Sequence, residues 1–325
     1  MTVKVQAQVG EPMRGIRPVD PTRDMLAIVE LVALGFEDEL DPQGQKMLAE
    51  MRQAARHRTL SALTMGVDLD PVGFVWVEDG CVVGNLSLRY ALPGRTKGQL
   101  IGNVVVHPDY RGMGIGRALV EAAIQAVHHQ DTRWIGLEVR ENNPVACGLY
   151  TQMGFEKVGR QQHLLRPAHA PWPNVAPSRL PWRVSKPKDR LLWTQLADAI
   201  YARRQKWVLE VRPGQYTFGG LERRFNRWLD GEREEAWLYG AEEARLAVCV
   251  RTDKRSQFHL WDILVHPDEG AAGAQAVVAQ ALQATRRFPA WPVIALVADQ
   301  APLVQALFDV GFKLHRSLVQ MVMEL

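Results

Sequence analysis

The stretch that decides the fold lies in the N-terminal half of the chain. It reads Val104-Val105-Val106-His107-Pro108-Asp109-Tyr110-Arg111-Gly112-Met113-Gly114-Ile115-Gly116-Arg117. An apolar run ends at a proline, and a glycine-rich turn then opens a segment with helical apolar spacing. The first turn of a helix carries unpaired N–H groups and the positive dipole end, and glycines let an anion approach closely. The pattern predicts an anion site here, although glycines also serve any tight strand-to-helix turn.

The segments around this turn predict a mixed α/β fold (α+β). Apolar periodicity and turn residues give the following expected elements: helices at 24–34, 43–57, 115–129 and 144–153, and strands at 74–78, 81–90, 99–106, 134–139 and 156–165. Three adjacent antiparallel strands precede the turn, and a strand–helix–strand crossover includes it. A dinucleotide-binding fold is disfavoured because its glycines follow the first strand, and a Walker loop is excluded because no Gly-Lys-Ser/Thr follows.

The same order of elements recurs in the C-terminal half, which predicts a duplication. Val106-His107-Pro108-Asp109 recurs as Val265-His266-Pro267-Asp268, and the Gly154-Phe155 motif recurs as Gly311-Phe312. Six of the 19 prolines fall between Pro167 and Pro187, so we expect a linker there. We therefore predict a first domain over residues 14–166, a Pro-rich linker over 167–180 and a second domain over 181–325.

Composition limits the class of protein. The chain has 325 residues, 47% of them hydrophobic, and a net charge of +3, which fits about two globular domains rather than a nucleic-acid coat. Its three cysteines, Cys81, Cys147 and Cys249, are far apart, and no Cys/His spacing is typical of a metal site. No secretory or membrane-spanning pattern is visible. We expect a cytoplasmic protein without a metal.

Two motifs together resemble the GNAT acyltransferase superfamily. These are the Val-x-His-Pro-Asp-Tyr-Arg-Gly-Met-Gly-Ile-Gly-Arg run that ends at Arg117, and the later segment from Asn143 through Tyr150 to Phe155. The resemblance is strong over residues 14–166 and weak over 180–325. It implies two GNAT-like domains, each a mixed, mostly antiparallel sheet flanked by helices, with an intact N-terminal copy and a degenerate C-terminal copy.

The resemblance implies an acetyl-coenzyme A site. The backbone of Arg111, Gly112, Met113, Gly114, Ile115 and Gly116 would hold the pyrophosphate, and the backbone of Val104, Val105 and Val106 would pair with the pantetheine arm. Arg111 and Arg117 would add charged contacts, or Arg117 is a solvated helix residue. The N–H of Val105 or Val106 would stabilise the oxyanion. Asn143 would lie near the pantetheine, cap the next helix, or do both.

The resemblance also implies the proton-transfer groups. Tyr150 matches the family's proton donor. Glu138 is the candidate base, because Leu137-Glu138-Val139-Arg140 followed by this tyrosine resembles ribosomal-protein alanine acetyltransferases; the alternative is a solvent-facing strand glutamate. The segment 37–41, which has four carboxylates, would attract a cationic amine or relay a proton through water, or it is simply solvated.

The second copy has lost these groups in sequence. Alignment at Val106 and Val265 places Gly270 opposite Arg111, Gln275 opposite Gly116 and Val297 opposite Glu138, while Leu307 or Phe308 replaces Tyr150. We therefore expect this copy to be non-catalytic. Mycothiol synthase has a similar tandem arrangement, but there the active copy is C-terminal.

The expected activity is transfer of an acetyl group from acetyl-coenzyme A to a primary amine of a small molecule, peptide or protein. The alternative is a non-catalytic acyl-coenzyme A-binding module that regulates a partner. Residues 160–230 carry a local charge of +9, but Arg223, Arg224 and Arg227 fall on the polar face of an amphipathic pattern, so nucleic-acid binding is disfavoured. The sequence does not indicate an oligomeric state.

Overall fold

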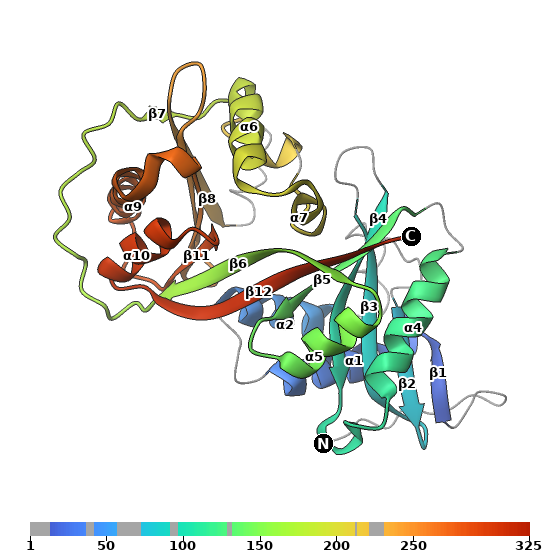
Figure 1. Ribbon diagram of the computed structural model, residues 1–325. Helices are drawn as coiled ribbons and strands as arrows, with labels where there is room; N and C mark the ends of the chain where they lie inside the picture. The colour runs from blue at the N-terminus through green and yellow to red at the C-terminus, as the bar shows by residue number, and fades with distance from the viewer. Residues whose placement is uncertain are drawn as a thin grey trace. The chain divides into compact units, whose positions relative to one another are not determined.

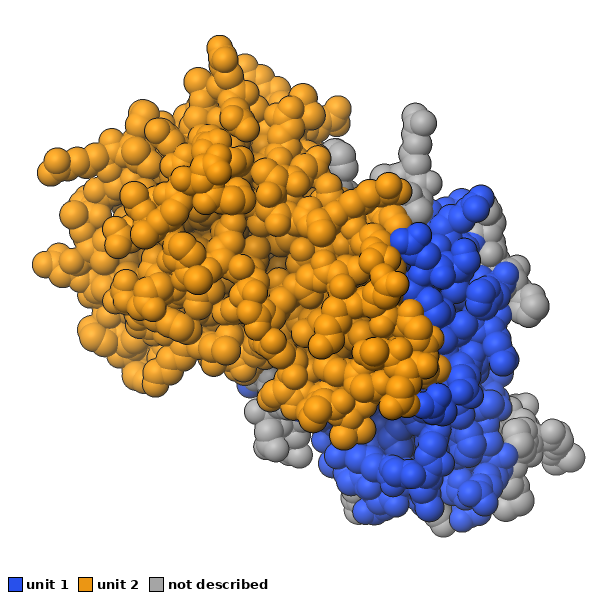
Figure 2. Space-filling view, viewed as in Figure 1, with its two compact units in different colours: residues 1–138, 323–325 blue, residues 139–322 orange. Residues whose placement is uncertain are grey.

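The structure is a computed structural model that describes residues 14–36, 42–56, 73–91, 97–128, 132–211, 213–220 and 231–325 (Figure 1). Its contacts divide the chain into two compact units, coloured separately in Figure 2. Unit 1 comprises Met1–Glu138 with Met323–Leu325, and unit 2 comprises Val139–Val322. The division falls inside one strand, at Glu138, so each unit is described by itself.

Unit 1 is a mixed sheet with helices on both faces. Its elements are β1 (Arg14–Pro18), α1 (Pro21–Phe36), α2 (Pro42–Arg56), β2 (Gly73–Glu78), β3 (Cys81–Ala91), β4 (Gly98–Val106), the 3-10 turn η2 (Pro108–Tyr110), α4 (Ile115–His128) and the start of β5 (Trp134–Arg140). The strands β1 to β4 are successively antiparallel, and β4 pairs with β5 in parallel. This confirms the predicted mixed fold, while β1 was missing from the prediction.

The two faces of the unit 1 sheet are covered by different helices. Gly35 of α1 lies against Val105, and a Cβ at Gly35 would meet the Val105 side chain at 2.6 Å. On the other face Gly84 lies under α4, where a Cβ would be 2.9 Å from Ile115. Close approach of each helix therefore depends on a residue without a side chain.

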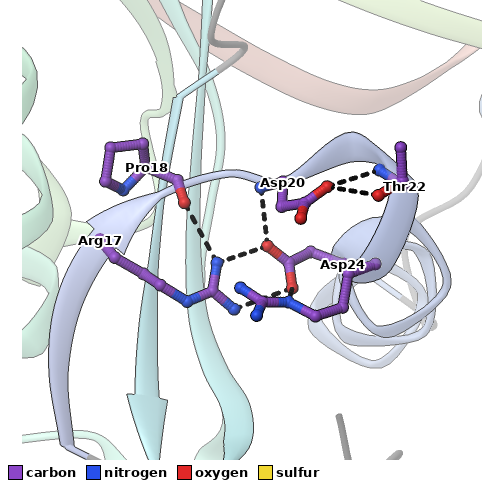
Figure 3. Close-up of polar contacts among 6 residues, drawn as sticks. Arg17, Pro18, Asp20, Thr22 and Asp24 are labelled. Carbon is purple, nitrogen blue, oxygen red and sulfur yellow. Dashed lines mark hydrogen bonds and ion pairs between the residues drawn. The ribbon is translucent and has the colours of Figure 1, made fainter. Parts of the chain in front are cut away.

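A buried carboxylate fixes the start of α1 (Figure 3). Asp24 is fully buried, and Arg17 donates to both of its oxygens, at 2.6 and 2.9 Å. The Asp20 N–H donates to the same carboxylate at 2.8 Å. The second copy repeats this arrangement, because Asp189 accepts from Arg183 at 2.7 Å and from the Lys186 N–H at 2.8 Å. Each copy thus anchors its first helix to the strand before it.

Unit 2 contains a sheet in the order β12-β6-β11-β10-β9-β8-β7. Its elements are α5 (Pro144–Gln152), β6 (Glu156–Arg166), β7 (Arg183–Val184), η3 (Pro187–Asp189), α6 (Arg190–Ile200), α7 (Arg203–Val208), η4 (Pro213–Tyr216), β8 (Glu232–Tyr239), β9 (Leu246–Asp253), β10 (Phe258–Val265), η5 (Pro267–Glu269), α9 (Gly270–Thr285), β11 (Val293–Ala298), α10 (Ala301–Asp309) and β12 (Lys313–Glu324). The core joins side chains of β9, β10 and β11 to α9 and α10.

The proline-rich segment, residues 167–182, contains neither helix nor strand, but it is packed. Trp172, Val175, Leu180 and Trp182 contact the main core of unit 2. The buried Arg166 donates to the carbonyls of Ala170 and Pro171, at 3.0 and 2.6 Å, and its guanidinium lies 4.5 Å from the Trp172 ring centre. This connection is therefore tied to the unit along its length.

The last strand of each sequence copy lies beside the other within unit 2. Figure 1 shows β6 and β12 side by side, and they pair antiparallel with Gln161 opposite Leu318. Both residues stand six positions after the Gly-Phe motif of their own copy. The other neighbour of β6 is β11, which belongs to the second copy. The first copy has thus contributed its terminal strand to the sheet of the second.

Candidate active site

The β4 strand leaves part of its edge unpaired. Its parallel pairing with β5 runs from Gly98 opposite Trp134 to Ile101 opposite Leu137, and no β5 pairing of residues 102–106 is found in the described part of the chain. On its other side β4 stays paired with β3, where Asn85 lies opposite Val105 and Gly84 opposite Val106. The segment Val104, Val105 and Val106 therefore offers a backbone edge to an extended ligand.

The glycine-rich turn follows this edge directly. Gly112 and Gly114 have φ angles of +78° and +80°, and a Cβ at either would meet nothing within 4 Å. The turn is exposed, α4 begins at Ile115, and Gly116 lies in its first turn. Positive φ values here favour glycine, and the open space above them leaves the backbone accessible. The helix N-terminus and turn can therefore receive an anion.

The two arginines of the motif have different surroundings. Arg111 is exposed, and its Nε donates to the Val106 carbonyl at 3.1 Å, which ties the turn to the end of β4. Arg117 lies 3.8 Å from Glu121 one helical turn later, and both side chains are largely exposed. Such a pair is typical of a solvated helix surface. Arg111 is thus the arginine that belongs structurally to the turn.

The second copy begins alike and then differs. His266 caps η5 by accepting from the Asp268 N–H at 3.3 Å, as His107 caps η2 by accepting from the Asp109 N–H at 3.4 Å. The α9 helix then starts at once, at Gly270, so residues 270–273 are helical where residues 111–114 form the open turn. Carboxylates of Asp268 and Glu269 stand just before this helix, held by Arg245 at 3.3 and 2.8 Å. Asp268 matches Asp109 of the first copy, whereas Glu269 stands where the first copy has Tyr110, so the second copy has one more carboxylate before its helix.

Comparison with known proteins finds one family model for part of the chain. Residues 36–155 match the Acetyltransferase (GNAT) family. This region, which holds the β4 edge and the glycine-rich turn, is similar to that family. The [ribosomal protein bS18]-alanine N-acetyltransferase of Escherichia coli is 40% identical over 55 residues, which cover 17% of this chain and 37% of that protein. This chain spans only 22–39% of the length of the first curated relatives it matches.

Solved structures support a GNAT fold over the whole chain. A GCN5-related N-acetyltransferase from Sphaerobacter thermophilus aligns with a TM-score of 0.63 at 17% identity, covering 97% of this chain and 96% of that one. A tandem GNAT protein from the clavulanic acid biosynthesis pathway aligns with a TM-score of 0.58 at 18% identity, covering 96% and 98%. These two alignments support a fold made of two GNAT-like copies in tandem.

Glu138 is the last residue of unit 1, on β5. It directly follows Leu137, the last β5 residue paired with β4, and it is exposed between the buried Leu137 and Val139. An exposed strand carboxylate can exchange protons with water. Its counterpart in the second copy, Val297, is fully buried in β11.

Asn143 and Tyr150 belong to α5, in unit 2. Asn143 is the N-cap of this helix, and its Oδ1 accepts from the Ala146 N–H at 3.0 Å. Tyr150 is 5% exposed and packs edge-on against Phe155, with ring centres 5.9 Å apart. Burial, with a further contribution from the Cys147 thiol, raises the pKa of the Tyr150 phenol to about 12. The phenol is therefore protonated at every ordinary pH.

The structure identifies the residue that replaces Tyr150 in the second copy. The Phe155 N–H donates to the Tyr150 carbonyl at 3.0 Å, and the Phe312 N–H donates to the Leu307 carbonyl at 3.1 Å. Leu307, and not Phe308, is thus the equivalent residue. It is fully buried and has no proton to donate.

Some features of the sequence analysis fall elsewhere. The acidic residues 37–41 and the amphipathic segment 221–229 lie outside the described residues. Within the described ranges, no group of three or more His, Cys, Asp or Glu side chains could hold a metal ion. The helices of these ranges include none long and apolar enough to span a membrane.

Sequence reasoning missed one feature of the site. Between Asn85 opposite Val105 and Ser87 opposite Gly102, β4 holds one residue more than β3, so β4 contains a bulge. Asn103 adopts a φ of +50° there. An asparagine inside an apolar strand is the available signal, because asparagine tolerates left-handed backbone better than other residues with a side chain.

Proposed function

We propose that the chain is an acetyl-coenzyme A-dependent N-acetyltransferase whose reaction is carried by the first copy, residues 14–166. The observation that carries this proposal is the unpaired β4 edge at residues 104–106, followed by the open turn at residues 111–114 in unit 1. A pantetheine arm is an extended chain of amides that can pair with such an edge. Its pyrophosphate would accept from the N–H groups of the turn.

The chain's own residues supply the remaining steps. The N–H of Val105 or Val106 would donate to the thioester oxygen as it becomes an oxyanion. Glu138 would take the proton from the attacking ammonium, directly or through water, and Tyr150 would give its phenolic proton to the thiolate that leaves. The amine nitrogen then bonds to the acetyl carbon, the carbon–sulfur bond breaks, and the nitrogen releases its second proton to water, from which the Tyr150 phenolate regains a proton. This is direct transfer, with no acyl-enzyme intermediate.

The buried environment of Tyr150 suits a proton donor that stays protonated. With a pKa of about 12, the phenol keeps its proton across the range in which amines become free bases. The rate of acetyl transfer is therefore expected to rise through pH 8 to about 10 without a fall near the ordinary phenol pKa of about 10.

The acceptor is proposed as a primary amine, on a small molecule, a peptide or a protein. A relative that acts on the alanine of a ribosomal protein, by its name, shares 40% identity over 55 residues. The second copy, residues 181–325, is proposed to be non-catalytic, since Val297 and Leu307 replace the proposed base and acid. Residues 167–180 join the two copies.

The experiment is a thiol-release screen. The full chain is incubated with acetyl-coenzyme A and a panel of amines: amino acids, polyamines, aminoglycosides, lysine peptides and peptides with free N-terminal alanine. Release of thiol that depends on the amine, with acetylated product seen by mass spectrometry, supports the proposal. Coenzyme A binding without transfer to any member of the panel would instead favour a regulatory binding module.

A further inference from the structure

A small polar cluster lies on the α1 face of the unit 1 sheet, at the β4 bulge. Asn85 is fully buried, and its Nδ2 donates to the Asn103 carbonyl at 2.9 Å. The Ser87 Oγ lies 3.5 Å from the Nδ2 atoms of both Asn85 and Asn103. The three side chains thus join β3 to β4 where the regular ladder is interrupted.

The orientation of Asn85 is fixed by its partner. A carbonyl oxygen can only accept, so the amide nitrogen of Asn85 must face Asn103. Its Oδ1 then points away, buried, with no hydrogen-bond partner among the residues that the structure describes. An unpaired buried oxygen is destabilising, and an apolar side chain would avoid it. What Asn85 gains in return is the bond to the Asn103 carbonyl.

That bond holds the backbone that the proposed reaction uses. Asn103 has a left-handed φ of +50°, which a side chain normally avoids. Asn85 lies directly opposite Val105, two residues after Asn103, and pairing of β4 with β5 ends at Ile101, two residues before it. The bulge therefore sits between the paired part of β4 and the proposed oxyanion donors.

The second copy lacks both the cluster and the bulge. Its β9–β10 ladder runs without interruption from Phe258 opposite Asp253 to Val265 opposite Leu246. There Ala247, opposite Leu264, replaces Asn85, and Cys249 and Asp262 face each other in place of Ser87 and Asn103. Parallel pairing with β11 continues to Asp262, the counterpart of Asn103. The first copy thus has both the hydrogen bond from Asn85 to the Asn103 carbonyl and the interrupted ladder, and the second copy has neither.

We propose that Asn85 is a positioning residue, which fixes the β4 bulge through the Asn103 carbonyl and so aims the N–H of Val105 or Val106 at the thioester oxygen. This inference rests on the proposed acetyl transfer. Asn85 acts through the backbone and touches neither the amine nor the phosphates. Its loss should therefore slow transfer and leave coenzyme A affinity unchanged.

The test compares Asn85→Ala with two changes at Asn103. Asn103→Gly keeps a residue that accepts positive φ, whereas Asn103→Val introduces one that resists it. For each folded variant, the single-turnover rate of acetyl transfer and the Kd for coenzyme A are measured. Because misplacing a reacting group by about 1 Å can cost about 10²-fold, Asn85→Ala and Asn103→Val should slow transfer by about that factor. Asn103→Gly should stay within about twofold of the wild type, and all Kd values should remain alike.

A second readout does not require activity. In amide NMR spectra of the full chain, the Val105 and Val106 signals should differ between the acetyl-coenzyme A and coenzyme A complexes, and Asn85→Ala should abolish this difference. Wild-type rates and signals in Asn85→Ala, or parallel losses of rate and coenzyme A affinity, would overturn the inference. If the wild type transfers acetyl to no amine, the proposed function fails instead, and the NMR comparison still decides whether Asn85 positions these N–H groups.

Discussion

The two Val-His-Pro-Asp motifs form the same backbone turn, but the residues that follow them differ in conformation and charge. In both, a histidine caps a 3-10 turn by accepting from the aspartate N–H. The first copy continues into an open glycine turn with exposed N–H groups, and the second continues directly into α9 behind Asp268 and Glu269. An anion site thus depends on the four residues after the 3-10 turn and on nearby charge, and not on the strand–turn–helix fold itself.

The largest effect should come from separating the copies. Within unit 2, β6 of the first copy lies between β11 and β12 of the second. Residues 181–325 expressed alone lack this strand, so β12 loses its partner in the unit and the edge of β11 is exposed. We expect complete loss of cooperative unfolding, measured by circular dichroism in urea. Coexpressed fragments 1–180 and 181–325 should copurify and unfold cooperatively, whereas a stable monomer of 181–325 would show that the exchanged strand is dispensable.

The next effect concerns the tyrosine that only the first copy carries. Tyr150→Phe removes the phenolic proton but keeps the packing on Phe155, so turnover should fall by about 10²–10⁴-fold if chemistry limits the rate. Coenzyme A affinity should not change. The matched control is Tyr216→Phe, which removes a buried phenol from the second copy and should leave turnover unaltered. An unchanged single-turnover rate in Tyr150→Phe would remove this residue from the mechanism.

A matched pair of charges probes the two helix starts. Met113 and Ala272 occupy equivalent exposed positions in the alignment of Val106 with Val265. Met113→Asp places a negative charge beside the proposed pyrophosphate, and repulsion of about 1–4 kcal/mol at about 4 Å should weaken coenzyme A binding at least about fivefold. Ala272→Asp should have no effect. Equilibrium dialysis with labelled coenzyme A measures both, and equal losses in the two variants would contradict a site confined to the first copy.

A smaller effect should appear where β6 pairs with β12. His163 of β6 accepts from Arg316 Nε of β12 at 3.1 Å, and burial, followed by the positive Arg316, lowers the pKa of His163 to about 3. The unfolded chain binds this proton near pH 6.5, so the stabilisation is complete above about 6.5 and declines as the pH falls toward 3. His163→Gln keeps an acceptor without a titrating group. Urea unfolding between pH 7 and 4.5 should therefore show a flatter dependence for the variant; identical slopes would refute the assignment.

Periodicity and turn residues were sufficient for most of the fold. The helices and strands around the glycine turn follow from apolar spacing, and the duplication follows from the repeated Val-His-Pro-Asp and Gly-Phe motifs. The two short strands β1 and β7 were missed, because Arg14–Pro18 contains Ile16 as its one aliphatic residue and Arg183–Val184 has only two residues. Exchange of β6 could not be inferred, since either sheet would bury the same apolar face.

The candidate site was predictable in part. Gly112 and Gly114 were identified because positive φ and close approach both require glycine. The β4 bulge was not predicted. The single asparagine at position 103 resembles an ordinary strand residue until the β3–β4 register shows one extra residue in β4. Likewise, the choice between Leu307 and Phe308 needed the hydrogen bond of the Phe312 N–H, which a one-residue gap in the alignment leaves undetermined.

The central claim is that one copy alone receives the cofactor, and its most direct test is calorimetric titration of the full chain with coenzyme A. We predict one equivalent bound per chain, with an affinity that falls at least about fivefold in Met113→Asp and is unchanged in Ala272→Asp. Two equivalents, or a single equivalent whose affinity falls in Ala272→Asp and not in Met113→Asp, would contradict this claim.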